Sequence, residues 1–364
     1  MPPPLAYIKT INSPFGVTLM KFNKLGRTNL EVSEICLGTM TWGEQNSEQE
    51  AHEQIEFALD KGVNFMDTAE LYAVPPKAHT QGLTEKYIGS WFKKSGQRDK
   101  WIVATKISGA GLPWIRNGDP ISPKSIRKAL EGNLKRLQTD YVDLYQLHWP
   151  NRGSFHFQNA WTFDASKQNK NETISDMLAI LETLDALVRE GKIRHVGVSN
   201  ESTWGIAQYL KLAEENNLPR MVTVQNEYSL LQRQFDLDLA ELSHHEDVGL
   251  LAWSPLAAGA LSGKYLDGAT PKGTRKDISN DMWRHNEFSE PAIRAYINLA
   301  ADYNLDPNQM ALAYCLTKPF MASVIIGATN LAQLETNITA HKLKLSSDVI
   351  AGIEAIYRRF PRPI

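Results

Sequence analysis

The sequence predicts an α/β fold, a (β/α)8 TIM barrel in which eight parallel strands alternate with helices. Short β-branched runs alternate with amphipathic helical patterns along most of the 364 residues. No GxGxxG motif opens a helix after the first strand, which argues against the alternative, an open doubly wound sheet. The eight predicted strands are Ile35–Leu37, Val63–Met66, Trp101–Thr105, Val142–Leu147, His195–Val198, Met221–Val224, Leu250–Trp253 and Ser323–Ile326.

The first 19 residues differ from the rest of the chain. They begin with Met1 and three prolines, and they lack the basic and apolar regions of a signal peptide. We therefore expect residues 1–19 to form a flexible extension. Residues 20–364 are expected to form a single barrel domain.

The helices between the strands have recognisable ends. Ser47 with Glu50 three residues later forms a capping box at the start of the first helix. Apolar residues at helical spacing predict a helix over Ile174–Glu190. Pro123 and Pro307 stand where the first turn of a helix tolerates proline.

Two inter-strand segments are unusually long. They run from Trp149 to Thr173, after the fourth strand, and from Ser254 to about Phe288, after the seventh. Long loops in a compact domain are usually functional or disordered. Both follow the carboxyl ends of strands, the end of a barrel that carries the functional site.

Composition and charge exclude several classes of protein. Lys plus Arg (39) nearly balances Asp plus Glu (41), so the net charge of −2 favours neither a nucleic acid nor a membrane surface as partner. The apolar runs are too short to span a membrane. Cys36 and Cys315 show no metal-binding or redox spacing. We expect a cytoplasmic protein.

Ionisable side chains follow three consecutive predicted strands. Asp67 comes after the second strand, Lys106 after the third and His148 after the fourth, while Tyr72 lies in the loop beyond Asp67. Singly, each has an ordinary explanation, as a turn residue, a solvated charge, a rim histidine or a packing tyrosine. Because neighbouring parallel strands end at the same rim, we expect the four to converge on one site.

Such a group suits the reduction of a carbonyl. An ammonium such as that of Lys106 favours the phenolate and so is expected to lower the pKa of Tyr72. Asp67 would keep Lys106 charged, and His148 would orient the substrate oxygen. A proton donor beside an oxyanion site fits a carbonyl oxygen that gains charge as hydride arrives at its carbon.

Ordered motifs along the chain resemble the aldo-keto reductase superfamily, most closely the Tas-type NADP(H)-dependent reductases of bacteria. They include LGTMTWG (37–43), DTAELY (67–72), RLQTDYVDLYQLHWP (136–150), GKIRHVGVSN (191–200), AWSPLAAGALSGKY (252–265) and IIGATNLAQLETN (325–337). The resemblance implies a TIM barrel in which Asp67, Tyr72, Lys106 and His148 are catalytic. Tyr72 would be the general acid in reduction and the base in the reverse direction.

The resemblance also implies NADP(H), bound across the barrel mouth without a Rossmann fold. Ser199, Asn200 and Gln225 would bind the carboxamide, and Trp253 would stack on the nicotinamide ring. Many relatives place Arg where Thr329 stands, so Lys264 and Arg275 are the candidates for holding the extra phosphate. The full implied set is Thr39, Met40, Gln45, Asp67, Ser199, Asn200, Gln225, Trp253, Ser254, Pro255, Leu256, Ala257, Ala258, Lys264, Arg275, Gly327, Thr329, Gln333 and Asn337.

Two other functions fit parts of the sequence. A cofactor-binding regulatory module is one, since potassium-channel β-subunits share WSPLA and SGKY with this chain; they carry Asn where His148 stands here. A metal-dependent hydrolase or lyase using Asp67 and His148 is the other, although HxH and HExxH are absent. The leading hypothesis is NADPH-dependent reduction of a small-molecule aldehyde or ketone. The aromatic side chains Trp114, Trp149, Phe155, Phe157 and Trp161 would offer walls for its pocket.

Overall fold

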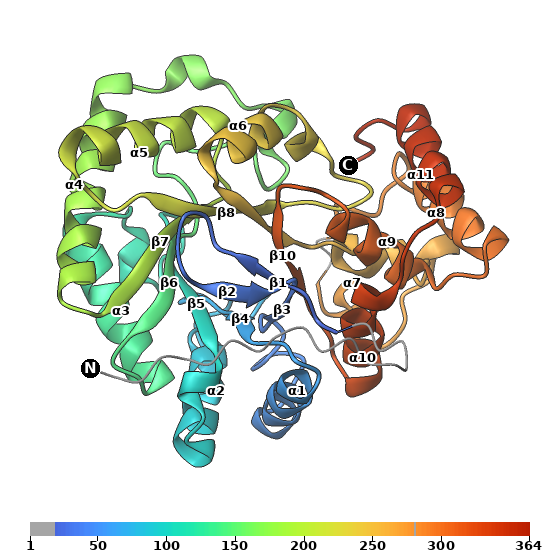
Figure 1. Ribbon diagram of the computed structural model, residues 1–364, viewed down its shortest axis with the longest axis horizontal. Coiled ribbons are helices and arrows are strands. Elements are labelled where there is room, and N and C mark those ends of the chain that lie inside the picture. Colours follow the sequence, from blue (N-terminus) through green and yellow to red (C-terminus); the bar gives the residue numbers. More distant parts are fainter. Residues whose placement is uncertain (1–18, 280–281) are drawn as a thin grey trace.

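Eight parallel strands close into a barrel in the computed structural model, which describes residues 19–279 and 282–364 (Figure 1). The order around the barrel follows the sequence, and the last strand pairs with the first. All eight predicted strands are confirmed. They are β3 (Ile35–Gly38), β4 (Phe65–Asp67), β5 (Ile102–Ile107), β6 (Val142–Leu147), β7 (Ile193–Ser199), β8 (Met221–Glu227), β9 (Gly249–Trp253) and β10 (Met321–Ile326).

Helices surround the barrel and connect its strands, so the predicted (β/α)8 architecture is confirmed (Figure 1). The single-turn helix α7 and the longer helices α8 and α9 lie between β9 and β10, and α11 near the carboxyl terminus packs beside α8. The helices are α1 (Glu48–Asp60), α2 (Leu83–Ser95), α3 (Pro123–Leu137), α4 (Lys170–Arg189), α5 (Thr203–Asn216), α6 (Asp238–Glu246), α7 (Arg275–Ile278), α8 (Glu290–Asp302), α9 (Pro307–Leu316), α10 (Leu331–Thr339) and α11 (Ser347–Arg359).

The helix starts follow the local sequence signals. Ser47 forms the predicted capping box, and Pro123 and Pro307 are the first residues of their helices. One helix, α4, begins before the predicted Ile174. The reason is Asn169, whose side chain accepts hydrogen bonds from the backbone N–H groups of the first turn.

A hairpin of two short antiparallel strands, β1 (Phe22–Lys24) and β2 (Glu31–Ser33), covers the amino-terminal end of the barrel. Its Leu25 and Val32 are fully buried against residues of the barrel interior. This hairpin was not predicted from the sequence. Because it covers one end, the carboxyl end of the barrel is the one left for a site.

Both predicted long loops are present at the carboxyl end. The loop after β6 contains two short 3₁₀ helices, Asn159–Trp161 and Ala165–Lys167. The loop after β9 contains the 3₁₀ helix Ala257–Ser262 and the single-turn helix α7. Residues 1–18 of the expected amino-terminal extension lie outside the described residues.

No helix in the described ranges has the length and apolar character needed to cross a bilayer. Cys36 and Cys315 are both buried free thiols.

Candidate active site

Four predicted side chains meet at the carboxyl ends of β4, β5 and β6. Asp67 is the last residue of β4, and His148 directly follows β6. Lys106 was predicted to follow the third strand but lies within it, because β5 extends to Ile107. Tyr72, on the loop after β4, completes the group.

Lys106 is the centre of this group. Its side chain is fully buried, and Nζ donates to Asp67 Oδ2 at 2.7 Å and to the Thr68 carbonyl oxygen at 2.8 Å. A third hydrogen bond joins Nζ to the Tyr72 hydroxyl at 3.3 Å. Burial alone would lower the pKa of Lys106, but Asp67 and Tyr72 raise it above its usual value. The side chain is therefore held as an ammonium.

The expected lowering of the Tyr72 pKa is wrong in direction. Burial raises the pKa of this phenol more than Lys106 lowers it, and the Asp67 carboxylate adds to the increase. The prediction included the effect of the ammonium but not that of the loss of solvent. At neutral pH the hydroxyl is consequently protonated, which is the form a proton donor requires.

Asp67 is held by two amides as well as by Lys106. Gln225 Nε2 donates to its Oδ1 at 2.8 Å, and Gln146 Nε2 donates to the same oxygen at 3.3 Å. The family resemblance implies Gln225 as a cofactor contact, whereas Gln146 was not predicted to belong to the site. A signal was present, because Gln146 is a polar residue two positions after Leu144, whose side chain packs inside the barrel.

His148 is buried and neutral. Its backbone N–H donates to the Ile107 carbonyl oxygen at 3.1 Å, and its own carbonyl oxygen accepts from Asn200 Nδ2 at 2.9 Å. The ring forms an edge contact with the ring of Tyr72, with centroids 5.9 Å apart. Burial first, and then Lys106, lower the pKa of His148 well below 6.5. The buried Nδ1 has no hydrogen-bond partner among the described residues.

The residues expected to bind the cofactor line the same end of the barrel. Several are already hydrogen-bonded within the protein. Thr39 Oγ1 donates to the Asp67 carbonyl oxygen at 2.8 Å, and Ser199 Oγ donates to the Gln225 carbonyl oxygen at 2.7 Å. Asn200 differs, since its Oδ1 is buried without a partner among the described residues. That oxygen can accept a hydrogen bond from an amide such as a carboxamide group.

The loop after β9 forms an unusual backbone turn. Ser254, Ala257, Ala258 and Gly259 have φ values of 52°, 50°, 56° and 89°. A Cβ atom on Gly259 would lie 2.8 Å from Lys264 Nζ, so this glycine permits the close approach. Turns of this kind aim backbone N–H groups at an anion, and the ammonium adds positive charge. Pro255 and Leu256 lie within the turn, and Arg275 begins α7 beyond it.

The remaining expected contacts lie on both sides of that loop. Gln45, on the loop that includes Met40, donates from Nε2 to the Gly273 carbonyl oxygen at 3.1 Å. Two further side-chain contacts join α10 to the segment before it. Gln333 Oε1 accepts a hydrogen bond from the Thr329 hydroxyl, and Asn337 Nδ2 donates one to the Gly327 carbonyl oxygen. Asn46 Nδ2 donates to the Thr329 carbonyl oxygen at 2.9 Å, so the loops after β9 and β10 both contact the loop after β3.

Aromatic side chains surround the opening beside His148. Phe157 is nearly parallel to Trp253, with ring centroids 5.8 Å apart, and forms an edge contact with Trp149. Two cavities of about 570 and 620 Å³ lie along the loop after β6, one lined by Trp149 and the other by Phe157. Trp161 belongs to the rim and is 76% exposed.

Comparison with known proteins identifies the family. The model of the aldo/keto reductase family matches residues 34–358. Protein tas of Escherichia coli (strain K12) is 47% identical over 354 residues, which cover 94% of this chain and 99% of the relative. The uncharacterized oxidoreductase YrpG of Bacillus subtilis (strain 168) is 33% identical over 351 residues, covering 94% and 97%. A protein named aldo-keto reductase from Babesia bovis is 37% identical over 257 residues, covering 66% and 88%.

Proposed function

This chain belongs to the aldo/keto reductase family, and we propose that it reduces aldehydes or ketones to alcohols with NADPH, using Tyr72 as the proton donor. The observation that carries the proposal is the hydrogen bond between the Tyr72 hydroxyl and a fully buried Lys106 ammonium, itself paired with Asp67. At the carboxyl end of a barrel, a phenol held against a charged ammonium is placed to donate a proton to a bound substrate.

Each side chain has a distinct part in the proposed reaction. The neutral phenol of Tyr72 transfers its proton to the substrate oxygen as negative charge develops there. Lys106 stabilises the resulting phenolate, and Asp67 keeps the ammonium charged and in place. In the direction of alcohol oxidation, the same phenolate accepts the proton.

His148 orients the substrate. Its neutral imidazole offers an N–H to the carbonyl oxygen without adding a second positive charge beside Lys106. A preorganised donor at this position favours the transition state, in which the oxygen carries the most charge.

The residues present fit a nicotinamide dinucleotide. When bound, NADPH supplies the hydride that reduces the carbonyl carbon. The unpartnered Asn200 Oδ1 would accept from the carboxamide, and Ser199 and Gln225 lie beside it. The turn at Ser254–Gly259 and Lys264 would hold phosphate groups, and α10 would present its amino-terminal end to the adenosine portion. Trp253 would flank the nicotinamide ring.

The two buried free thiols agree with a reducing compartment, so the proposed location is the cytoplasm.

A direct absorbance assay of NADPH consumption tests the proposal. We expect purified protein to consume NADPH when 4-nitrobenzaldehyde, methylglyoxal or another member of a broad carbonyl panel is added. NADH, assayed in parallel, should be used less efficiently. Absence of consumption across the whole panel would contradict the proposal and favour a cofactor-binding regulatory module.

A further inference from the structure

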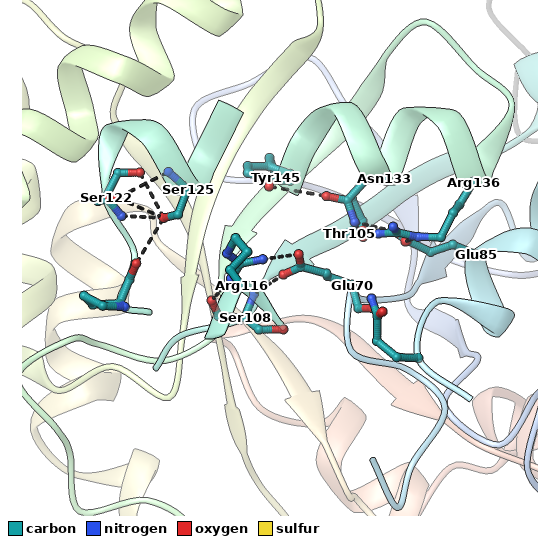
Figure 2. Close-up of polar contacts among 12 residues, drawn as sticks. Glu70, Glu85, Thr105, Ser108, Arg116, Ser122, Ser125, Asn133, Arg136 and Tyr145 are labelled. Carbon is teal, nitrogen blue, oxygen red and sulfur yellow. Dashed lines mark hydrogen bonds and ion pairs between the residues drawn. The ribbon is translucent and has the colours of Figure 1, made fainter. Parts of the chain in front are cut away.

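A buried ion pair behind the site joins the two segments that carry Tyr72 and Lys106. Glu70 lies on the turn between Asp67 and Tyr72. Its backbone N–H donates to the Lys106 carbonyl oxygen at 3.1 Å, and its Oε2 accepts from the backbone N–H of Ser108 at 2.9 Å. Figure 2 shows Glu70 and Ser108 facing each other across this contact. One side chain thus connects the turn to the end of β5.

Arg116 completes the connection from a third segment. Its guanidinium pairs with Glu70 Oε1, and its Nη2 donates to the Ser108 carbonyl oxygen at 2.7 Å (Figure 2). Each of the two charged side chains is only 7% exposed. Ser108 is therefore held through both its N–H and its carbonyl oxygen. The planar fork of arginine can make both contacts at once.

The backbone at Arg116 is itself unusual. Arg116, Asn117 and Gly118 have φ values of 48°, 60° and 79°. These values lie in the left-handed region, which residues other than glycine rarely adopt. A conformation of this kind persists only where surrounding contacts maintain it. The ion pair between Arg116 and Glu70 is such a contact, and it fixes the orientation of the Arg116 side chain.

The charge of Glu70 depends on its partner. Burial raises the pKa of the Glu70 carboxyl. Arg116 lowers this pKa, but by less, so that it remains above its usual value. Without Arg116, the carboxylate would have to bind a proton or turn toward water, because a buried charge without a partner is strongly unfavourable. Turning toward water releases Ser108, and with it the attachment of the turn to β5.

We propose that Glu70 and Arg116 are positioning residues that hold the Tyr72 hydroxyl within hydrogen-bonding distance of Lys106 Nζ. Neither residue touches the reacting atoms. Their effect is transmitted through the turn at 68–72 on one side and Lys106–Ser108 on the other. The effect on catalysis rests on the proposed function, whereas the effect on the distance between the two atoms does not.

The molecule offers a matched control in a second buried pair. Arg136 Nε donates to Glu85 Oε2 at 2.7 Å, and the Glu85 side chain is fully buried. This pair joins α2 to α3 on the outside of the barrel (Figure 2). It shares the chemistry of the Glu70–Arg116 pair, but the hydrogen bonds of its two side chains do not involve residues 68–72, the turn that carries Tyr72.

The test compares crystal structures of the full chain with Arg116→Ala, Arg116→Lys and Arg136→Ala. We expect the Tyr72 Oη to Lys106 Nζ distance to lengthen by about 1 Å or more in Arg116→Ala and to stay at its wild-type value in Arg136→Ala. Arg116→Lys keeps a cation beside Glu70 without the fork, so it should fold and show an intermediate displacement. Unchanged distances in both Arg116 variants would overturn the proposal.

Kinetics with NADPH and a carbonyl substrate provide the second measurement. We expect kcat to fall about 30- to 100-fold in Arg116→Ala and less in Arg116→Lys, with the KM for NADPH nearly constant. Arg136→Ala should lower the melting temperature while leaving kcat within about twofold of wild type. Equal losses of kcat in Arg116→Ala and Arg136→Ala would overturn the proposal. If wild-type protein reduces no carbonyl, the proposed function fails, and the crystallographic distances still decide the positioning role.

Discussion

Consecutive residues of β5 belong to two different polar networks. Lys106 points into the barrel, where it binds Asp67 and Tyr72. Thr105 points outward, where its Oγ1 donates to Glu85 Oε1 at 2.6 Å. Both networks are buried, and both are built around a carboxylate paired with a cation. Burial and charge therefore do not distinguish the site from its surroundings.

The difference lies in how completely each network uses its hydrogen-bonding groups. Outside the barrel, Glu85 accepts from Thr105, Asn133 and Arg136 (Figure 2), and Arg136 Nη2 alone in this group is a buried atom without a partner. At the mouth, His148 Nδ1 and Asn200 Oδ1 are buried without partners among the described residues. A nearly saturated network such as the outer one stabilises the fold, whereas the unsaturated one at the mouth retains groups that can bind a ligand.

The largest expected effect is loss of turnover at the mouth. Tyr72→Phe should lower kcat about 10³- to 10⁴-fold, since no other group on the turn can supply the proton. NADPH affinity and the melting temperature should change little. The measurement is NADPH consumption under saturating substrate, with cofactor binding followed by fluorescence.

Tyr145→Phe is the matched control for that variant. Tyr145 is a fully buried tyrosine whose hydroxyl donates to Asn133 Oδ1 at 3.4 Å in the outer network. Loss of this hydrogen bond should lower the free energy of unfolding by about 1 kcal/mol and leave kcat unchanged. Similar kinetics for the two variants would remove the distinction between the networks.

The outer network should show the opposite pattern. Glu85→Ala leaves Arg136 and Asn133 without their acceptor, so the free energy of unfolding should fall by about 3–5 kcal/mol. The kcat of the folded protein should be close to wild type. Urea denaturation and initial rates on the same preparation measure both quantities.

Glu190→Ala provides the surface comparison for that change. Glu190 pairs with Arg127 in a partly exposed position, and such pairs contribute little. Its unfolding midpoint should match that of wild type. A loss as large as that of Glu85→Ala would show that burial of the pair is not what matters.

A smaller effect concerns histidine protonation. Burial lowers the pKa of His148 well below 6.5 and that of His156 to about 3, so neither binds a proton near neutrality in the folded state. In the unfolded chain each binds one near pH 6.5. Stability should therefore fall as the pH drops below that value, by up to about 1.4 kcal/mol per pH unit for each group.

The histidine contribution can be isolated with His156→Gln. Urea denaturation of this variant at pH 7 and pH 5 should show a smaller loss of stability in acid than wild type shows. The kcat should show no inflection near pH 6.5 that could be assigned to His148. An equal loss in acid for both proteins would contradict the assignment of His156 as buried and neutral.

Local patterns explain how much of this architecture could be predicted. The alternation of strands and helices, the capping box at Ser47 and the residues at the strand ends all depend on short stretches of sequence. The barrel then brings Asp67, Lys106 and His148 together because parallel strands end at one rim. These features follow from periodicity and from one rule of topology.

The features that were missed depend on distant pairs and on burial. Gln146 reaches Asp67, and Arg116 reaches Glu70, across separations in sequence that no local pattern encodes. Phe157 lies beside Trp253 because the long loop after β6 folds over the end of β9. The direction of the Tyr72 pKa shift was wrong for a related reason, since the sequence reveals the neighbouring ammonium but not the loss of water.

Transfer of deuterium tests most directly whether the unsaturated network at the mouth carries out carbonyl reduction. Wild-type protein is incubated with an aldehyde and NADPH that carries two deuterium atoms at C4 of the reduced ring, and the alcohol is analysed by mass spectrometry. We predict one deuterium on the carbinol carbon, and no alcohol above background from Tyr72→Phe. Alcohol without deuterium, or equal yields from the two proteins, would contradict hydride transfer assisted by Tyr72.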